Sequence, residues 1–118
     1  MSIRVRRIYD PSGPGDDGVR VLVDRLWPRG VSKEAAGIDE WPKALTPSHE
    51  LRRWYHGPEG GYEEFRRRYE AELAVPEAAE ALEGLRERAR GGPVTLLTAA
   101  RNPDRSHTSV LARLLAER

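Results

Sequence analysis

The stretch "GGPVTLLTA" (91–99) constrains the fold of this chain more than any other segment. Its two glycines stop a preceding helix, and a short, unbroken apolar run follows them. Such a run is typical of a strand that is buried on both faces, as strands in a parallel sheet are. Because helices must cover the faces of a parallel sheet, this stretch predicts an α/β protein.

Two earlier segments predict further strands. Residues 3–9 ("IRVRRIY") alternate in character along the chain, and residues 19–26 ("VRVLVDRL") are β-branched and largely apolar. Residues 11–18 between them form a loop rich in Pro, Gly and Asp. Because only about nine loop residues join the two strands, spacing alone favours an antiparallel hairpin, since parallel connections usually need a dozen or more.

The remaining pattern is largely helical. Helices are predicted over residues 32–37, 48–55, 62–73, 76–89 and 102–118. Ser32 and Ser48 are candidate N-caps, Gly37 is a stop signal, and Asn102 with Pro103 would begin the last helix. The apolar stripes of these segments predict buried packing positions at Trp41, Trp54, Phe65, Tyr69 and Leu82.

The composition indicates one soluble domain over residues 1–118, with a small, mostly parallel sheet and helices packed on its faces. Hydrophobic residues make up 38% and charged residues 33% of the chain, and the mean hydropathy is −0.69. The apolar runs are too short to span a bilayer, and no export leader opens the sequence, so we expect a cytoplasmic protein without membrane contact. With a net charge of +1, the chain has no overall field that would attract nucleic acid.

Four segments carry more distinctive motifs. These are "DRLWPRG" (24–30) within residues 7–41, "SHELRRWYHG", "YEEFRRRYEAEL" and "GPVTLLTAARNPDRSHTSVL". Together they resemble the YeaO-like branch of a bacterial domain-of-unknown-function family, from about residue 3 to the C-terminus. The resemblance implies an α/β sandwich around a largely parallel sheet whose first two strands run in the same direction, against the hairpin that spacing favours.

The resemblance also bears on chemistry in the late loop. Relatives in the wider family carry a pattern like C-A-E-x-x-P-x-x-C-H-R, and Thr98 and Ser106 stand at its two cysteine positions here. His107 keeps the histidine, and Thr108 replaces the arginine. The chain contains no cysteine, and its three histidines lack a metal-ligand spacing. We therefore expect no metal site and no cofactor.

The ends of the strands are where a ligand site is expected, because open α/β sheets bind ligands beyond the carboxyl ends of their strands. If the first two strands are parallel, Tyr9 and Asp10, residues 24–29 and residues 98–101 gather there. The N-terminus of the last helix would add free backbone N–H groups. The loops "VDRLWPRG" (23–30) and "TAARNPDRSH" (98–107) would then form the two halves of an anion pocket, unless Asp104 itself fills the helix start.

Candidate roles follow from residue chemistry. Asp24 would act as a general base or orient an arginine, and His107 would protonate or bind a ligand oxygen. The expected ligand-binding residues are Arg25, Trp27, Arg29, Thr98, Arg101 and Ser106. The structural alternatives are an Asp24–Arg25 ion pair and a packing role for Trp27.

Three functions compete at this point. The first is a site for a phosphate- or carboxylate-bearing small molecule, including a hydrolase or transferase. The second is a non-catalytic regulatory or interaction module that presents Trp27, Trp41 and Trp54 to a partner. The third and least favoured is nucleic-acid binding through Arg52, Arg53 and residues 66–68, because i,i+4 pairing with Glu70 and Glu72 explains that run as a solvated helix face. The sequence does not indicate which oligomeric state the protein adopts.

Overall fold

β3 (Val94–Thr98) is the central strand of a three-stranded parallel sheet with the order β1-β3-β2. The computed structural model of the chain describes residues 3–9 and 18–116. β1 (Ile3–Arg7) and β2 (Val19–Leu22) flank β3, and the first residue of each lies opposite Val94. All five residues of β3 are buried, as its unbroken apolar run predicts. The α/β class is therefore confirmed.

β1 and β2 run in the same direction, as the family resemblance implied, and the hairpin favoured by the loop length is wrong. Because β3 lies between them, the chain must return along one strand length and cross two inter-strand spacings. That distance is on the order of 20 Å. Eleven residues separate Arg7 from Val19, and eleven extended residues reach about 36 Å, so no crossover helix is needed. Of the predicted loop over 11–18, only Gly18 lies among the described residues.

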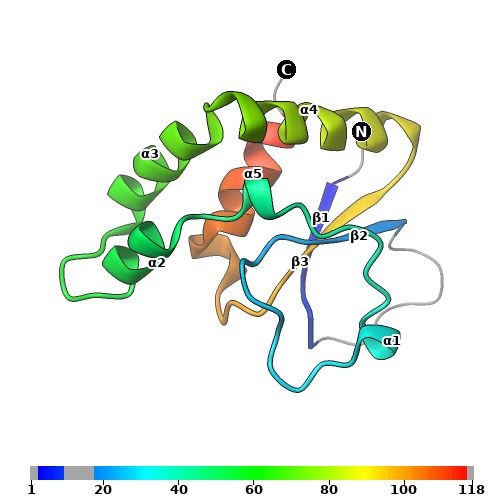
Figure 1. Cartoon of the computed structure of the whole chain (residues 1–118), viewed down its shortest axis with the longest axis horizontal. Helices are drawn as coiled ribbons and strands as arrows, with labels where there is room; N and C mark the ends of the chain where they lie inside the picture. The colour runs from blue at the N-terminus through cyan, green and yellow to red at the C-terminus, as the bar shows by residue number, and fades with distance from the viewer. Residues whose placement is uncertain (1–2, 10–17, 117–118) are drawn as a thin grey trace.

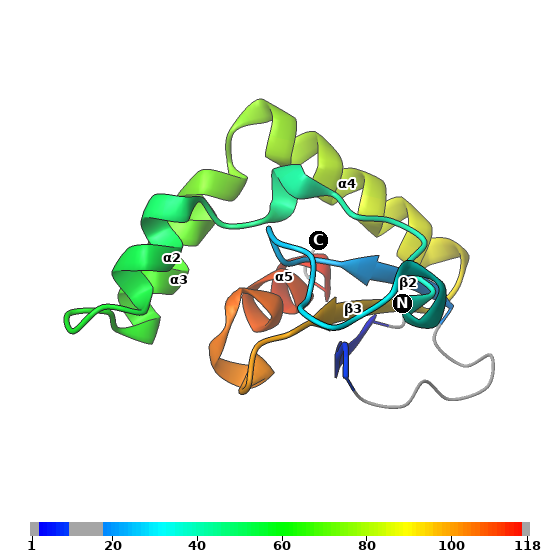
Figure 2. The same ribbon diagram turned by 60° about the horizontal axis from the view of Figure 1, so that its bottom comes forward.

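Five α-helices and two short 3₁₀ helices accompany the sheet in the described part of the chain (Figure 1). They are α1 (Lys33–Ala36), η1 (Lys43–Leu45), α2 (His49–Tyr55), α3 (Tyr62–Leu73), α4 (Pro76–Gly91), η2 (Pro103–Arg105) and α5 (His107–Ala116). Figures 1 and 2 show α2 and α3 side by side, with α4 running on from α3 along the sheet. Within this part of the chain, no helix is long and apolar enough to cross a membrane.

The two faces of the sheet are covered unequally. On one face, Val94 and Leu96 belong to a large apolar cluster that includes buried residues of α2, α3, α4 and α5. On the other face, Leu97 packs with Ile8, Ala36 of α1 and half-buried side chains such as Trp27. Nearly all of the helical mass therefore lies on one face, and a single helical turn with a loop covers the other.

The predicted packing positions are buried in three of five cases. Phe65 is 2% exposed and Tyr69 is fully buried, and the ring of Phe65 stacks between those of Tyr55 and Tyr69 at 4.2 and 5.7 Å. Leu82 is also buried. Trp41 and Trp54, by contrast, are only half-buried. Each indole lies at the edge of the core and carries a cation on its face, Lys43 on Trp41 and Arg68 on Trp54.

Local helix signals are confirmed at both predicted serine caps. Ser32 Oγ accepts the Ala35 N–H at the start of α1, which ends at Gly37 with φ of 59°. Ser48 Oγ accepts the Leu51 N–H at the start of α2. The backbone N–H and hydroxyl of Ser48 also donate to the Glu72 carboxylate, at 2.9 and 2.6 Å. This contact ties the beginning of α2 to α3.

The last helix begins later than its sequence signals predicted. Asn102 makes no capping hydrogen bond through its side chain, and Pro103 begins η2 rather than an α-helix. The chain then turns at Ser106, which is extended, and α5 starts at His107. Ser106 Oγ accepts the Thr108 N–H, so the serine and not the asparagine caps α5.

Candidate functional site

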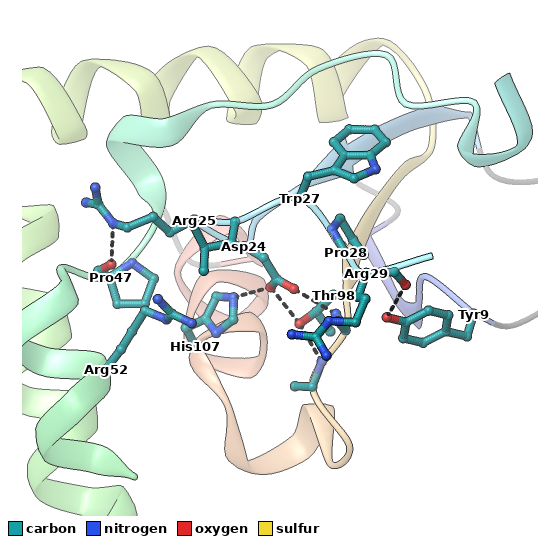
Figure 3. Close-up of a pocket in the computed structure, with 13 residues that line it drawn as sticks. Tyr9, Asp24, Arg25, Trp27, Pro28, Arg29, Pro47, Arg52, Thr98 and His107 are labelled. Carbon is teal, nitrogen blue, oxygen red and sulfur yellow. Dashed lines mark hydrogen bonds and ion pairs between the residues drawn. The ribbon is translucent and has the colours of Figure 1, made fainter. Parts of the chain in front are cut away.

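A cavity of about 420 Å³ lies at the carboxyl ends of the three strands (Figure 3). Tyr9 follows β1, residues 24–29 follow β2, and residues 98–100 end β3 and the turn after it. Arg52 of α2 and His107, the first residue of α5, complete the wall together with Pro47. The loops after β2 and β3 therefore line one cavity, which is possible because all three strands end at the same edge of the sheet.

Asp24 is the centre of the hydrogen bonds at the base of this cavity. Its Oδ1 accepts from Thr98 Oγ1 at 2.7 Å and from His107 Nε2 at 2.9 Å, and its Oδ2 accepts from the Ala99 N–H at 2.8 Å. Burial by itself would raise the pKa of this carboxyl. The hydrogen bond and charge of His107, with the bonds from Ala99 and Thr98, more than offset that effect, so the pKa of Asp24 lies below its ordinary value. The side chain is an ionised acceptor whose two oxygens are both engaged.

His107 is oriented by this carboxylate. Because ionised Asp24 can only accept, Nε2 of His107 carries the hydrogen in their contact. The edge-to-face contact with Tyr69, whose ring centroid lies 6.2 Å away, holds the other side of the imidazole. Nδ1 has no hydrogen-bond partner among the described residues, and the side chain retains 14% of its exposure. The imidazole can therefore offer Nδ1 to a ligand.

Thr98 and Ser106, which stand at the cysteine positions of the wider family, both use their hydroxyl groups in hydrogen bonds within the fold. Thr98 is fully buried, and its Oγ1 donates to Asp24 while it accepts the Ala100 N–H at 3.1 Å. Ser106 is buried, and its Oγ donates to the Pro103 carbonyl at 2.8 Å while it caps α5. Each hydroxyl already donates its one hydrogen bond, Thr98 to the Asp24 carboxylate and Ser106 to the Pro103 carbonyl. Neither is placed as a nucleophile.

Among the described residues, three arginines line the cavity, and their side chains point in different directions (Figure 3). Arg25 turns away from Asp24 and donates its Nε–H to the Pro47 carbonyl at 3.0 Å. The expected Asp24–Arg25 ion pair is therefore not formed, and His107 takes the place of the arginine at the carboxylate. Arg29 and Arg52 reach toward the Asp24–His107 pair from opposite sides. Among the described residues, neither guanidinium has a hydrogen bond or an ion pair.

Trp27 supports the wall of the cavity and also packs into the fold. Its indole N–H donates to the Val31 carbonyl at 2.6 Å, and its ring meets that of Trp41 edge-on at 5.4 Å. The Trp41 indole in turn donates to the Asp24 carbonyl at 2.7 Å. The packing role considered for Trp27 is thus present, and the residue lines the cavity as well.

Two residues expected at the ligand site do not line the cavity. Arg101 is exposed beyond the turn that follows β3, and Ser106 is buried beneath the start of α5. Asp104 lies in η2 and is exposed, so it does not fill the α5 start as the sequence suggested. The reason is the 3₁₀ turn over Pro103–Arg105, which separates "TAAR" from the helix. At the start of α5, Ser106 already accepts two N–H groups, that of Thr108 on its Oγ and that of Ser109 on its carbonyl.

Arg52 is the cavity residue that sequence reasoning placed elsewhere. It was grouped with Arg53 and residues 66–68 in a basic patch, yet Arg53 borders a separate hollow near Trp54. The side chains of Arg66, Arg67 and Arg68 pair chiefly with Glu63 and Glu64. Only Arg66 uses Glu70, and Glu72 binds Ser48 instead. Residues 66–68 therefore lie on a solvated helix face and form ion pairs, although their partners are mainly glutamates in the first turn of α3.

The histidines and acidic residues of the described chain form no cluster of three that could hold a metal ion. His49 and His56 are exposed. His107 has Asp24 as its neighbour and no second imidazole.

Comparisons with known proteins place these features in a family. A family model described as the inactive DUF488-N3 subclade matches residues 2–118. The chain is 47% identical over 114 residues to the Escherichia coli (strain K12) protein named "Uncharacterized protein YeaO", covering 95% of each. It is 45% identical over 113 residues to "Uncharacterized protein Rv3073c" of Mycobacterium tuberculosis (strain ATCC 25618 / H37Rv), covering 96% of this chain and 92% of that protein. No solved structure matches the chain significantly.

Proposed function

This chain belongs to the inactive DUF488-N3 subclade, and from that premise we propose that it binds a small phosphate- or carboxylate-bearing ligand without transforming it. The binding site is the cavity at the carboxyl ends of the strands. Arg29 and Arg52 provide the charge, Nδ1 of His107 at the base accepts a hydrogen bond from a protonated oxygen of the ligand, and Arg25 adds a more distant positive charge.

One observation carries the proposal: Arg29 and Arg52 have no carboxylate partner among the described residues. Asp24 is the single carboxylate among the described residues that line it, and that carboxylate is engaged by His107, Thr98 and the Ala99 N–H. Two guanidinium groups therefore face the cavity without an acceptor in the described part of the chain. Guanidinium groups bind carboxylate and phosphate oxygens through paired hydrogen bonds. An anionic ligand would therefore supply the acceptor oxygens for these two arginines.

Binding is favoured over a hydrolase or transferase reaction by the state of the reactive groups. Thr98 and Ser106 both donate their hydroxyl protons within the fold. Asp24 has a lowered pKa and three donors around it, which makes it a weak base and leaves it to orient His107. The description of the subclade as inactive agrees with a site from which a nucleophile is missing.

An interaction surface built from the three tryptophans has less support. Trp27 and Trp41 pack against each other beside the cavity, and Trp54 lies under Arg68. All three indoles are half-buried. They do not present one shared apolar face.

Isothermal titration calorimetry with inorganic phosphate and with acetate tests the proposal. Arg52→Ala should weaken binding of the tighter anion by about 10- to 100-fold, because a hydrogen bond to a charged group contributes about 1.5–3 kcal/mol. Arg53→Ala is the matched control, since Arg53 is the next residue of α2 and does not line this cavity.

The wild-type protein should bind at least one of the two anions, and its melting temperature should rise with the concentration of that anion. Equal affinities of the Arg52→Ala and Arg53→Ala proteins would refute the assignment of this cavity. No binding of either anion to the wild type would refute the function.

A further inference from the structure

The rim of the cavity is apolar, whereas its base carries charged side chains. Among the described residues, the large hydrophobic side chains left exposed are Tyr9 (49%), Leu26 (58%) and Val75 (51%). Two of these three line this one cavity, although they come from segments 17 positions apart in the chain. Exposed large apolar side chains that gather at a concave site are typical of ligand contacts rather than of ordinary surface.

The rim is held in place before any ligand arrives. The Tyr9 hydroxyl donates to the backbone carbonyl of Arg29 at 3.2 Å, so the tyrosine is tied to the backbone of the loop that follows β2 (Figure 3). The Arg7 guanidinium lies 5.6 Å from the centre of the Tyr9 ring. Leu26 lies between Arg25, whose Nε–H is bound to Pro47, and Trp27, whose indole is bound to Val31. A rim that is ordered in this way loses little conformational freedom when a ligand binds.

The charges of the lining residues favour a dianion. Among the described residues that line the cavity, three arginines and one carboxylate give a net charge of +2 without His107. A phosphate monoester can carry two negative charges and presents three terminal oxygens, whereas a carboxylate carries one charge on two oxygens. The cavity of about 420 Å³ lies in the range of pockets that hold drug-sized molecules, so a bare phosphate would leave most of it empty.

We propose that the ligand is a phosphate monoester of an aromatic alcohol, with its phosphate between Arg29 and Arg52 and its ring against Leu26 and Tyr9. This inference rests on the proposed anion-binding function and narrows it to one ligand class. The apolar residues Tyr9 and Leu26 line the same cavity as the cationic residues Arg29 and Arg52. A ring attached directly to the phosphate therefore reaches both regions at once.

The experiment compares phenyl phosphate with methyl phosphate, which keeps the monoester dianion and lacks the ring. In isothermal titration calorimetry on the wild-type protein, phenyl phosphate should bind at least about tenfold more tightly than methyl phosphate, which corresponds to 1.4 kcal/mol. Leu26→Ser should remove most of that preference, by weakening the binding of phenyl phosphate much more than that of methyl phosphate. Because Leu26 is 58% exposed, this variant should fold as the wild type does, which circular dichroism and the melting temperature would verify.

Val75→Ser is the matched control, because Val75 is similarly exposed and lies before α4, outside the cavity. The control should keep the full preference for phenyl phosphate. Equal binding of the two esters to the wild type, or equal behaviour of the Leu26→Ser and Val75→Ser proteins, would overturn the aromatic assignment and leave the anion site standing. Failure of the wild type to bind either ester, inorganic phosphate or acetate would overturn both proposals.

Discussion

Asp24→Asn removes the charge on which the base of the cavity is organised, while it preserves the shape of the side chain. In the wild type, the carboxylate accepts one bond from the backbone, one from a hydroxyl and one from an imidazole. An asparagine keeps one acceptor oxygen and turns the other into an NH₂ donor. If its oxygen takes the place of Oδ1, the new NH₂ faces the Ala99 N–H, and two donors then meet without an acceptor.

The size of the effect follows from these contacts. A hydrogen bond to a charged group contributes about 1.5–3 kcal/mol and a neutral one about 1 kcal/mol, while a buried donor without a partner costs about 1–3 kcal/mol. Asp24 retains only 16% of its side-chain exposure, so solvent replaces little of what is lost. We expect the free energy of unfolding at neutral pH to fall by about 2–4 kcal/mol. Asp104→Asn, at an exposed carboxylate, should change it by less than about 0.5 kcal/mol.

The pH dependence gives a second readout. The pKa of Asp24 lies below its ordinary value of 3.8 in the fold. Its charge therefore stabilises the native state fully above about pH 4, and this contribution disappears as the pH falls through the lowered pKa. Urea unfolding followed by tryptophan fluorescence at neutral pH and at successively lower pH should show the gap between wild type and Asp24→Asn narrowing below pH 4. A loss under about 1 kcal/mol at neutral pH, or a gap that stays constant with pH, would refute the reasoning.

Two further predictions concern the core and the backbone, and urea unfolding measures both. Phe65→Ala should lower the free energy of unfolding by about 3–5 kcal/mol, because the side chain is 2% exposed and stacked between two rings; a loss below about 1 kcal/mol would contradict that packing. Gly18 and Gly30 both have positive φ, but a Cβ at Gly18 would lie 2.1 Å from the Pro93 carbonyl oxygen, and one at Gly30 would meet nothing within 4 Å. Gly30→Ala should cost about 1–2 kcal/mol and Gly18→Ala about 1–3 kcal/mol more, and equal losses would show that the Pro93 contact is unimportant.

The elements whose signals are local could be predicted from the sequence. Ser32, Gly37 and Ser48 act at the helix ends where their residue types placed them, because a cap involves atoms only a few residues apart. The helix over residues 62–73 agrees with α3 at both ends, since its aromatic and leucine side chains repeat with the helical period. The buried strand could also be predicted from "VTLL", because an unbroken apolar run that follows a glycine stop is typical of a strand covered on both faces.

Strand order and direction were decided by tertiary structure. The patterns of residues 3–9 and 19–26 report which faces are apolar, but they carry no information about which strand lies beside them. The loop-length rule favoured a hairpin because it assumes that the two strands pair with each other. In the structure both pair with β3, which follows them in the chain by more than 70 residues.

The side chains of the cavity also divide into those that the sequence could predict and those that only the tertiary structure placed there. Sequence reasoning selected Asp24, Arg29, Thr98 and His107, because residues that follow strand patterns gather at one edge of a parallel sheet. It did not select Arg52 for this site, because that arginine belongs to α2 and does not follow a strand. Residue types and periods are written along the chain, whereas the direction of a side chain depends on how whole elements dock. That docking pairs Asp24 with His107 across 83 positions of sequence.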